Sequence, residues 1–396
     1  MGANISIIGA AENFLVRRIR PLVSQGTGVS WQVPDCGRRF LVLVLLMIGS
    51  GLAVPGFADA CRALEPPSGL HHTLWVHLDD DCSLPERREL AVSGADLLAA
   101  LEEGKNVDLH GVVVVGDVLL DHLSLHRVAD LPNLPSVVQD ALSQRHLDTI
   151  RFIPGSLRIT ASQFDQVFAT NLSDGALVIL GEVDFHQSEI VQSVDFSKVI
   201  FAEPVILAGM RVDFEAFFIG AQFLRAADFS QVVFGTHSRF HKAVFHDSVT
   251  FAGDRFKGVA EFLEVTFHGE AQLTNVSFES GAGFSGSVFH GPADFSDSTF
   301  TQEIYFRFTE FHNRIVFGGT DFHKVVDFSN AQFTQPADFS HASFAVRPES
   351  AGSNLILPDL SRTMWRSPAI QLSIAICLLL LVGLHYLRAG RKPETK

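Results

Sequence analysis

Apolar residues along most of the chain recur at alternating steps of five and six, a spacing that fits neither an α-helix nor an ordinary strand. Helices place apolar residues every three or four positions, and half-buried strands place them at every second position. In the stretch "GPADFSDSTFTQEIYFRFTEFHN" (residues 291–313), phenylalanine stands at positions 295, 300, 306 and 311. Steps of five, six and five therefore indicate a longer repeat.

Two series of positions, each advancing by eleven, account for this rhythm. The first series runs from Leu157 to Phe344, and all 18 of its positions are apolar, 14 of them Phe. The second series runs from Phe152 to Phe339, and among its 18 positions only Gln163 and Asp174 are not apolar. Because the two series hold 28 of the 35 Phe residues, internal repetition is the dominant property of this sequence.

Each repeat unit combines a short strand with a corner. A small or β-branched residue stands two positions before each Phe, as in "ADFS" (residues 293–296), and the residues between them are polar. Alternation by two places the small residue and the Phe on the same, inward side. Pro204, Pro292 and Pro336 each stand three positions after a series Phe, which is typical of turns. The pattern predicts that every second corner carries one extra residue.

These "ADFS" and "xxxF" segments resemble the pentapeptide-repeat family in a phenylalanine-rich form, over residues 152–344. The resemblance implies a right-handed parallel β-helix with four sides per coil and with the central Phe or Leu stacked inside. Steps of five, six, five and six then give a coil of about 22 residues, and a stack of such coils is a solenoid. We therefore expect an all-β, four-sided solenoid of about nine coils over residues 151–346.

Residues 1–60 are predicted to be a long lead followed by a secretory signal peptide. A 15-residue apolar stretch, Phe40 to Val54, follows two arginines and precedes Ala58-Asp59-Ala60, a small-x-small cleavage site before Cys61. An uncleaved anchor is the alternative, although this apolar stretch is short for a membrane span. A lipoprotein signal at Cys61 and a twin-arginine signal fit the flanking residues less well.

A second apolar segment, Pro368 to Leu387, has the length of a bilayer span, with Tyr386 at one end. The tail that follows, residues 388–396, contains four basic residues: Arg388, Arg391, Lys392 and Lys396. Because positive charge stays cytoplasmic, we expect a single-pass membrane protein with a cytoplasmic tail and an extracytoplasmic solenoid.

Two regions flanking the repeats are expected to cover the open ends of the solenoid. The first, residues 61–150, is predicted to form a small α/β cap. A short helix from Ala95 to Glu103 begins at Ser93 or Gly94, and a second helix, Leu134 to Leu147, is inserted between early coils. The second region, residues 347–367, is predicted to be a linker and C-terminal cap, in which Asn354 to Leu360 closes the last coil.

Cysteine usage fits export from the cytoplasm. Cys36 lies before the predicted cleavage site and Cys377 lies in the predicted span, so Cys61 and Cys82 alone remain in the exported part. An even pair in an oxidising compartment is a disulfide candidate. The alternative is a pair of free thiols.

A search for catalytic motifs predicts no enzyme, cofactor or small-molecule substrate. "GAGFSG" (residues 281–286) formally matches a dinucleotide-binding motif, but Phe284 belongs to the repeat and no helix follows. Phosphate-loop, zinc-protease and nucleophile-elbow motifs are missing from the sequence. "DDDC" (residues 79–82) could bind calcium, although a solvated acidic turn is the simpler interpretation.

Four histidines that recur at the spacing of one expected coil are the one group of candidate metal ligands. They are His246, His268, His290 and His312, and we call them the histidine ladder. Each follows a series Phe and should point outward, so a 22-residue coil would stack them on one face. Adjacent imidazoles could share a transition metal, but a plain surface ladder without metal is expected, because no carboxylate partner is evident in the sequence. Stacked imidazoles should also resist full protonation.

Charge favours a protein partner over nucleic acid. The formal net charge is −14, and residues 152–346 contain 23 acidic and 11 basic side chains, which disfavours direct binding to phosphates. The sequence predicts a membrane-anchored extracytoplasmic scaffold or protein-interaction module whose partner is unknown. The alternative is an acidic β-helix that imitates nucleic acid and binds a DNA-handling enzyme, although such targets are cytoplasmic and the predicted topology is not.

Overall fold

A computed structural model of the chain describes residues 61–131, 133–172, 175–357 and residue 376. The predicted signal peptide (1–60) and cytoplasmic tail (388–396) lie outside the described residues, as does the predicted span (368–387) apart from residue 376. Within the part of the chain that the structure describes, no helix has the length and apolar character needed to cross a membrane.

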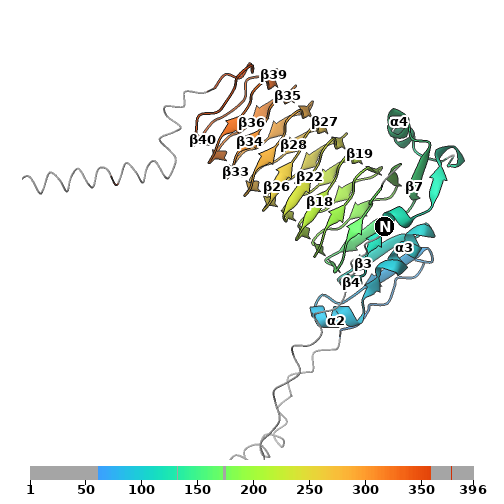
Figure 1. The fold of residues 1–396 in the computed structure, drawn as a ribbon. Helices are drawn as coiled ribbons and strands as arrows, with labels where there is room; N and C mark the ends of the chain where they lie inside the picture. Colours follow the sequence, from blue (N-terminus) through green and yellow to red (C-terminus); the bar gives the residue numbers. More distant parts are fainter. Residues whose placement is uncertain (1–60, 132, 173–174, 358–375, 377–396) are drawn as a thin grey trace, which may run out of the picture. The chain divides into compact units, whose positions relative to one another are not determined.

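The described strands form a solenoid of four sheets, which the chain visits in a fixed order (Figure 1). We number the sheets in the order in which each coil passes through them. Among the described strands every pair is parallel except β6 with β7. The predicted all-β parallel solenoid is therefore confirmed, and the right-handed turn of the coil stays a prediction.

Sheet 1 has ten strands and sheet 2 has eleven. Sheet 1 consists of β1 (Thr73–His77), β3 (Asn106–His110), β8 (Leu157–Thr160), β12 (Val183–Asp184), β16 (Val205–Ile206), β20 (Ala227–Asp228), β24 (Val249–Thr250), β28 (Ala271–Gln272), β32 (Ala293–Asp294) and β36 (Ile315–Val316). Sheet 2 consists of β2 (Val92–Ser93), β4 (Val113–Val115), β9 (Gln163–Phe164), β13 (Glu189–Ile190), β17 (Arg211–Val212), β21 (Val233–Phe234), β25 (Arg255–Phe256), β29 (Ser277–Phe278), β33 (Thr299–Phe300), β37 (Asp321–Phe322) and β40 (Ser343–Phe344).

Sheet 3 has nine strands and sheet 4 has ten. Sheet 3 consists of β5 (Val118–Leu119), β10 (Phe168–Ala169), β14 (Val194–Asp195), β18 (Glu215–Phe217), β22 (His237–Arg239), β26 (Val259–Glu261), β30 (Ala282–Gly283), β34 (Ile304–Tyr305) and β38 (Val326–Asp327). Sheet 4 consists of β6 (Leu125–Arg127), β7 (Thr149–Ile153), β11 (Leu177–Ile179), β15 (Val199–Phe201), β19 (Gln222–Phe223), β23 (Val244–Phe245), β27 (Thr266–Phe267), β31 (Val288–Phe289), β35 (Glu310–Phe311) and β39 (Gln332–Phe333).

The expected 22-residue coil is confirmed over most of the solenoid. From β12 onward each strand pairs with its counterpart one such coil later, as Val183 does with Val205. Three earlier coils are longer, because Thr73 pairs with Asn106, Val107 with Leu157, and Leu157 with Val183. The coil between Val107 and Leu157 is the longest of the three, and it contains the inserted helix α4.

The solenoid begins earlier than the Phe pattern predicts. Strands β1 to β5, in the predicted cap (61–150), continue sheets 1, 2 and 3, and the solenoid has about eleven turns rather than about nine. These coils fill their interior with smaller side chains, including Val107, Leu109 and Val118, each fully buried. The prediction missed them because it counted Phe, whereas Val and Leu can also fill an inward position.

Three short helices and two 3₁₀ turns belong to the N-terminal part. The helices are α2 (Leu84–Glu89), α3 (Gly94–Glu102) and α4 (Ser136–Gln144), and the turns are η1 (Leu120–His122) and η2 (Val128–Asp130). The expected start of α3 is confirmed, because the Ser93 hydroxyl accepts the Asp96 N–H at 3.0 Å. The second predicted helix is α4, although it is shorter than residues 134–147. Helix α2 was not predicted.

Helix α4 packs on the outer face of sheet 4. Its Val138, Ala141 and Leu142 are buried against outward apolar residues of that sheet, including Ile200 and Leu224. Phe152 packs with this outer cluster and is only half-buried, so its predicted place inside the solenoid is wrong. The long coil that carries α4 shifts the repeat here, which moves Phe152 out of the interior.

The same shift affects other early members of the two series. Leu157 pairs with Val183, so it occupies the small-residue position rather than a Phe position. Phe164 pairs with Ile190, and the interior position in β9 is therefore Phe164 instead of Gln163. Asp174 lies outside the described residues. The two non-apolar members of the second series thus mark the place where the rhythm changes.

Stacked aromatic rings fill the solenoid interior. All positions of the first series from Ile179 to Phe344, and all positions of the second from Phe185 to Phe339, are buried. Rings one coil apart lie nearly parallel, with centroids 4.4 Å apart for Phe267 and Phe289 and 4.6 Å apart for Phe278 and Phe300. Each of the four sides therefore contributes one column of side chains to the interior.

The "ADFS" segments also form corners. The Asp294 carboxylate accepts the N–H of Ser296 at 2.8 Å, a side-chain turn that replaces a backbone hydrogen bond. The same bond to the Ser two positions later is made by Asp195, Asp228, Asp327 and Asp338. The residue after this Ser has a positive φ, as does every eleventh residue from Gln187 to Gly352. The prediction placed turn chemistry at the prolines and missed this corner.

Asn354 completes the hydrogen bonding of the last described strand in sheet 4. Its side-chain oxygen accepts the Phe333 N–H, and its side-chain nitrogen donates to the Phe333 carbonyl, both at 2.8 Å. Leu355 packs against the interior cluster. Of the predicted closing segment, Asn354 to Leu360, the structure describes residues up to 357, and these cover part of the C-terminal end.

Asp254 is a buried acid at a position where other coils place a small side chain. Its Oδ1 accepts the N–H of Val232 at 2.9 Å, while its Oδ2 is buried without a hydrogen-bond partner. In a later coil Ser298 accepts the equivalent N–H from Val276 and also donates to the Leu273 carbonyl at 2.7 Å. Burial raises the pKa of Asp254 well above the usual carboxyl value, so the folded chain favours its neutral form.

We predict that Phe295→Ala lowers the free energy of unfolding by about 3–5 kcal/mol, because it opens a cavity in a stacked column. Phe295 is fully buried. Urea unfolding followed by circular dichroism measures the change. Phe214→Ala is the matched control, since Phe214 is 54% exposed and the same truncation there leaves no cavity. A loss below about 1 kcal/mol at Phe295 would show that this site is not in the core.

Asp254→Ser is expected to stabilise the fold at pH 7 by about 1–3 kcal/mol, because serine satisfies both backbone groups without a buried unpaired oxygen. The raised folded pKa means that wild-type stability is greatest below the unfolded pKa and falls as pH rises toward the folded pKa. The variant should lack this fall. Urea unfolding at pH 4, 6 and 8 checks both effects, with the exposed Asp247→Ser as control. Equal pH slopes in wild type and variant would contradict the account.

Candidate binding faces

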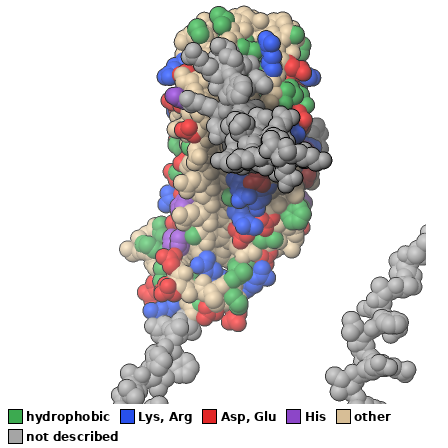
Figure 2. Space-filling model, turned by 90° about the vertical axis from the view of Figure 1, so that its left-hand side faces the viewer, with side chains coloured by type: hydrophobic (Ala, Val, Ile, Leu, Met, Phe, Trp, Pro, Cys, Tyr) green, Lys and Arg blue, Asp and Glu red, His purple; other side chains and the backbone are tan. Residues whose placement is uncertain are grey.

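The outward side chains give each sheet of the solenoid a different chemistry. Sheet 2 carries ion pairs such as Arg211 with Glu189, at 3.3 Å, and Arg255 with Glu279. The face drawn in Figure 2 shows acidic, basic and hydrophobic side chains interspersed.

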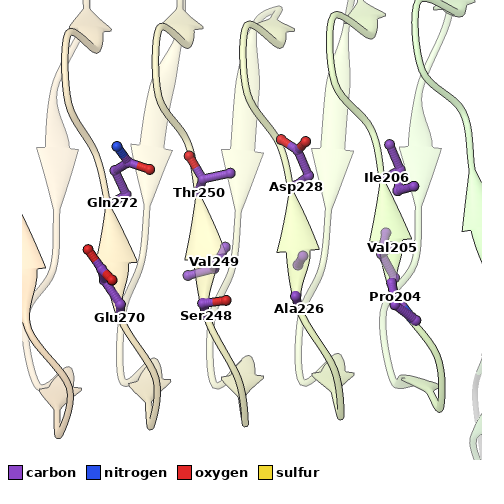
Figure 3. Close-up of a pocket in the computed structure, with 11 residues that line it drawn as sticks. Pro204, Val205, Ile206, Ala226, Asp228, Ser248, Val249, Thr250, Glu270 and Gln272 are labelled. Carbon is purple, nitrogen blue, oxygen red and sulfur yellow. The ribbon is translucent and has the colours of Figure 1, made fainter.

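Sheet 1 has a shallow, acidic hollow over four neighbouring coils (Figure 3). Its volume is about 370 Å³, and its lining contains two acids, Asp228 and Glu270, and no basic residue. The remaining lining side chains are small or uncharged: Pro204, Val205, Ile206, Ala226, Ala227, Ser248, Val249, Thr250 and Gln272. Short side chains leave the sheet surface flat, so this face offers a broad contact for an extended or flat partner.

The histidine ladder lies on sheet 4 and is aligned, as the 22-residue coil requires. Ring centroids are 5.3 Å apart for His246 and His268, 5.0 Å for His268 and His290, and 5.0 Å for His290 and His312. The ladder continues the row that begins with Ala202 and Leu224 beneath α4. It therefore starts where the helix no longer covers the face.

Burial and mutual repulsion disfavour the charged forms of His246 and His268. Burial lowers the pKa of His246, and the neighbouring His268 lowers it further. The pKa of His268 is lowered by burial and then by His290. His312 has a carboxylate partner, Glu310, at 2.9 Å on the same strand. The sequence interpretation overlooked this pair, although a spacing of two in a strand places both side chains on one face.

Metal coordination is not supported by the described side chains. Within the part of the chain that the structure describes, no group of three or more His, Cys, Asp or Glu residues could hold a metal ion. In the acidic turn at residues 79–82, Asp80 pairs with His110 at 3.0 Å. "GAGFSG" contains strand β30 in sheet 3, and among the described residues no helix follows it.

A polar network that the sequence interpretation missed joins the first coils of sheet 1. His77 stacks on Trp75 with centroids 4.2 Å apart and pairs with Asp108 at 2.9 Å. His110 contacts the Thr160 hydroxyl at 2.8 Å. These residues share one face because β1 pairs in register with β3, across the segment that carries α2 and α3. The repeat period gave no indication of this pairing.

Cys61 and Cys82 form a disulfide, with their Cα atoms 5.0 Å apart. The bond joins the start of the described chain to the residue before the N-cap of α2. Cys82 is buried and Cys61 packs against the interior cluster. The bridge therefore fastens the polypeptide that precedes the first coil.

Comparison with known proteins gives one family match. A family model described as "Pentapeptide repeats (9 copies)" matches residues 255–299 and 295–343. No curated protein and no solved structure matches the chain. The matched residues lie in the regular part of the solenoid, where the 22-residue coil and the four interior columns continue without interruption.

We predict that the histidine ladder makes stability depend on pH. Because His246 and His268 have lowered folded pKa values, stability should fall as pH drops below about 6.5, where unfolded histidine binds protons. His268→Gln should reduce this fall. Urea unfolding at pH 7.5 and 5.5 measures it, with the exposed His323→Gln as control. An unchanged pH slope in His268→Gln would contradict the prediction.

Titration with Zn²⁺ or Ni²⁺ is expected to show no tight stoichiometric binding to the ladder, because the described residues supply no third ligand. Isothermal titration calorimetry checks this. Tight binding that disappears on replacing His268 and His290 with Gln would instead make this face a metal site.

Proposed function

We propose that this chain, a pentapeptide-repeat β-solenoid, acts as a non-catalytic scaffold that presents its faces to a protein partner. The observation that carries the proposal is the separation of interior from surface. Aromatic columns hold the backbone in register along the solenoid, and the outward residues are free to vary from sheet to sheet. A binding surface built on a packed sheet is more precise than one built on loops.

We further propose that the solenoid is exported and anchored in a membrane by the segment at residues 368–387. The apolar stretch before Cys61, the basic tail after residue 387 and the Cys61–Cys82 disulfide support this topology from three separate parts of the chain. The proposal predicts mature protein that begins at Cys61.

Topology and export can be tested together on the full chain. A reporter that is active only in the cytoplasm should be active when fused after Lys396, because the basic tail remains inside. N-terminal sequencing should give Cys61, and alkylation without reductant should label neither Cys61 nor Cys82. An inactive reporter, or labelling of both thiols, would contradict the exported topology.

Partner capture from membranes then tests the scaffold proposal. The full chain, crosslinked in its native membrane, should retain a specific protein, and exchanging exposed residues of one sheet should release it. Asp228→Lys with Glu270→Lys reverses the charge of the hollow of sheet 1, and Arg255→Glu reverses one charge on sheet 2 for comparison. Capture that is insensitive to every surface exchange would count against a scaffold.

The second candidate function is imitation of nucleic acid by the acidic surface. The observation that favours it is the excess of 23 acidic over 11 basic residues in residues 152–346, together with the hollow of sheet 1, whose lining contains acids and no base. Such a mimic competes with DNA for its target, so the captured protein should be released by added duplex DNA. Release by DNA, with a cytoplasmic solenoid, would favour this alternative over the exported scaffold.

A further inference from the structure

One buried acid of the solenoid lacks the cationic partner that the others have. Among the described residues the buried acids are Asp184, Asp254 and Asp327. Asp184 pairs with His186 at 2.7 Å, and Asp327 pairs with Arg307. Asp254 is 1% exposed and forms no ion pair with a described residue. An unpaired carboxylate in an apolar interior is so costly that the group takes up a proton instead.

At equivalent positions of other coils, a hydroxyl group bridges two backbone groups of the preceding coil. Asp254 and Ser298 each stand two residues before the inward Phe of a sheet 2 strand. The Ser298 hydroxyl accepts a backbone N–H of the preceding coil at 2.9 Å and donates to the Leu273 carbonyl at 2.7 Å. Thr320, one coil later, donates to the Phe295 carbonyl at 2.8 Å. A polar side chain at this position therefore acts as both acceptor and donor.

Asp254 meets the same two backbone groups. Its Oδ1 accepts the Val232 N–H at 2.9 Å, and the same N–H also donates to the Phe229 carbonyl at 3.2 Å. Phe229 precedes Asp254 by the same interval by which Leu273 precedes Ser298. A carboxylate can only accept hydrogen bonds, whereas a protonated carboxyl also has an O–H donor. The neutral acid can therefore make both bonds of the serine, and the ionised acid only one.

The surroundings of Asp254 oppose its ionisation. Burial raises its pKa well above the usual carboxyl value, the bond from the backbone offsets part of this shift, and the negative charge of Asp228 on β20 adds to it. The inward residues before and after it in the row, Val232 and Val276, are buried and apolar. The adjacent Arg255 lies on the outer face, where it forms an ion pair with an acid of the next coil.

We propose that Asp254 retains a proton, donates it to the Phe229 carbonyl and forms a proton-operated latch between the coils of β21 and β25. When this junction opens, the hydrated carboxyl releases its proton to solvent, and the Phe229 carbonyl bonds to water instead. Contacts in a solenoid are made between neighbouring coils, so one junction can loosen without unfolding the whole stack. The inference goes beyond the proposed function, because a scaffold does not require a junction that responds to pH.

The latch is closed at low pH and loosens as the pH rises. In the open junction the Asp254 carboxyl has the ordinary pKa of about 3.9, whereas in the closed junction its pKa is raised. Between these two values opening releases one proton, so the equilibrium constant for opening rises about tenfold per pH unit. Above the folded pKa the constant levels off. The histidine ladder has the opposite sign, because its folded pKa values are lowered.

Hydrogen–deuterium exchange of the full chain in detergent, measured from pH 5 to pH 9, tests the latch with Asp254→Asn as the reference. The amide of asparagine accepts the Val232 N–H and donates to the Phe229 carbonyl, but it has no proton to lose. In peptides that cover β21 and β25, the wild-type exchange rate divided by the variant rate should rise at least tenfold over this range. The division removes the intrinsic pH dependence of exchange and the effect of the ladder. Peptides that cover β33 should show a constant ratio.

Asp254→Val provides a second reference, which should fold because Val occupies this position in both neighbouring coils. The wild-type rate divided by the rate of this variant should rise in the same way. Infrared spectroscopy detects the proton directly: the wild type at pH 6, where exposed carboxyls are ionised, should retain the absorption of a protonated carboxyl that both variants lack. Ratios that stay constant with pH, or a wild type without this absorption, would overturn the proposal.

Discussion

Stacking of phenylalanine rings one coil apart is the interaction on which the rest of the structure depends. Strands in a sheet lie about 4.8 Å apart, and parallel aromatic rings can approach to a similar distance. The centroid separation of 4.6 Å between Phe278 and Phe300 satisfies both constraints at once. Each coil must therefore return every ring to the same position, which holds the coils without an insertion to one constant length. The corners, the hydrogen bonds from Ser N–H groups to Asp carboxylates at those corners, and the rows of outward side chains all repeat with the same period.

The period was readable from the sequence because a solenoid repeats one local environment many times. The inward columns follow from counting Phe positions, whereas the four sides, and with them the 22-residue coil that aligns the histidine ladder, followed from the resemblance to the pentapeptide-repeat family. Counting Phe positions could not find the coils whose interior is filled by other apolar residues. Val107 and Val118 fill the interior of the first coils without aromatic rings. Helix α2 also escaped prediction, although Ser83 and Glu86 form a capping box that the sequence displays.

Other features of the surface depend on contacts that no periodicity reveals. Phe152 lies outside the interior because the preceding coil contains an insertion. In the sequence, a Phe at that position has the same spacing whether it faces the interior or the outer surface. The buried Asp254 sits at a small-residue position, where the sequence gives no indication that its second oxygen lacks a partner. The small residues of "GAGFSG" were visible in the sequence, but only the structure shows that Gly281, Gly283 and Ser285 line a hollow on the outer face of sheet 3, where β30 pairs with β26 and β34.

The central claim is the 22-residue register, and pairwise disulfide formation measures it most directly. Thr250 and Gln272 are partners in neighbouring strands of sheet 1, whereas Thr274 stands two positions further along the chain. Cysteines can be joined when their Cα atoms are within about 7 Å. Under mild oxidation, the pair Thr250→Cys and Gln272→Cys should form a bond, identified by non-reducing peptide mapping, while Thr250→Cys and Thr274→Cys should remain largely unlinked. Preferential linkage of the second pair would contradict a 22-residue coil.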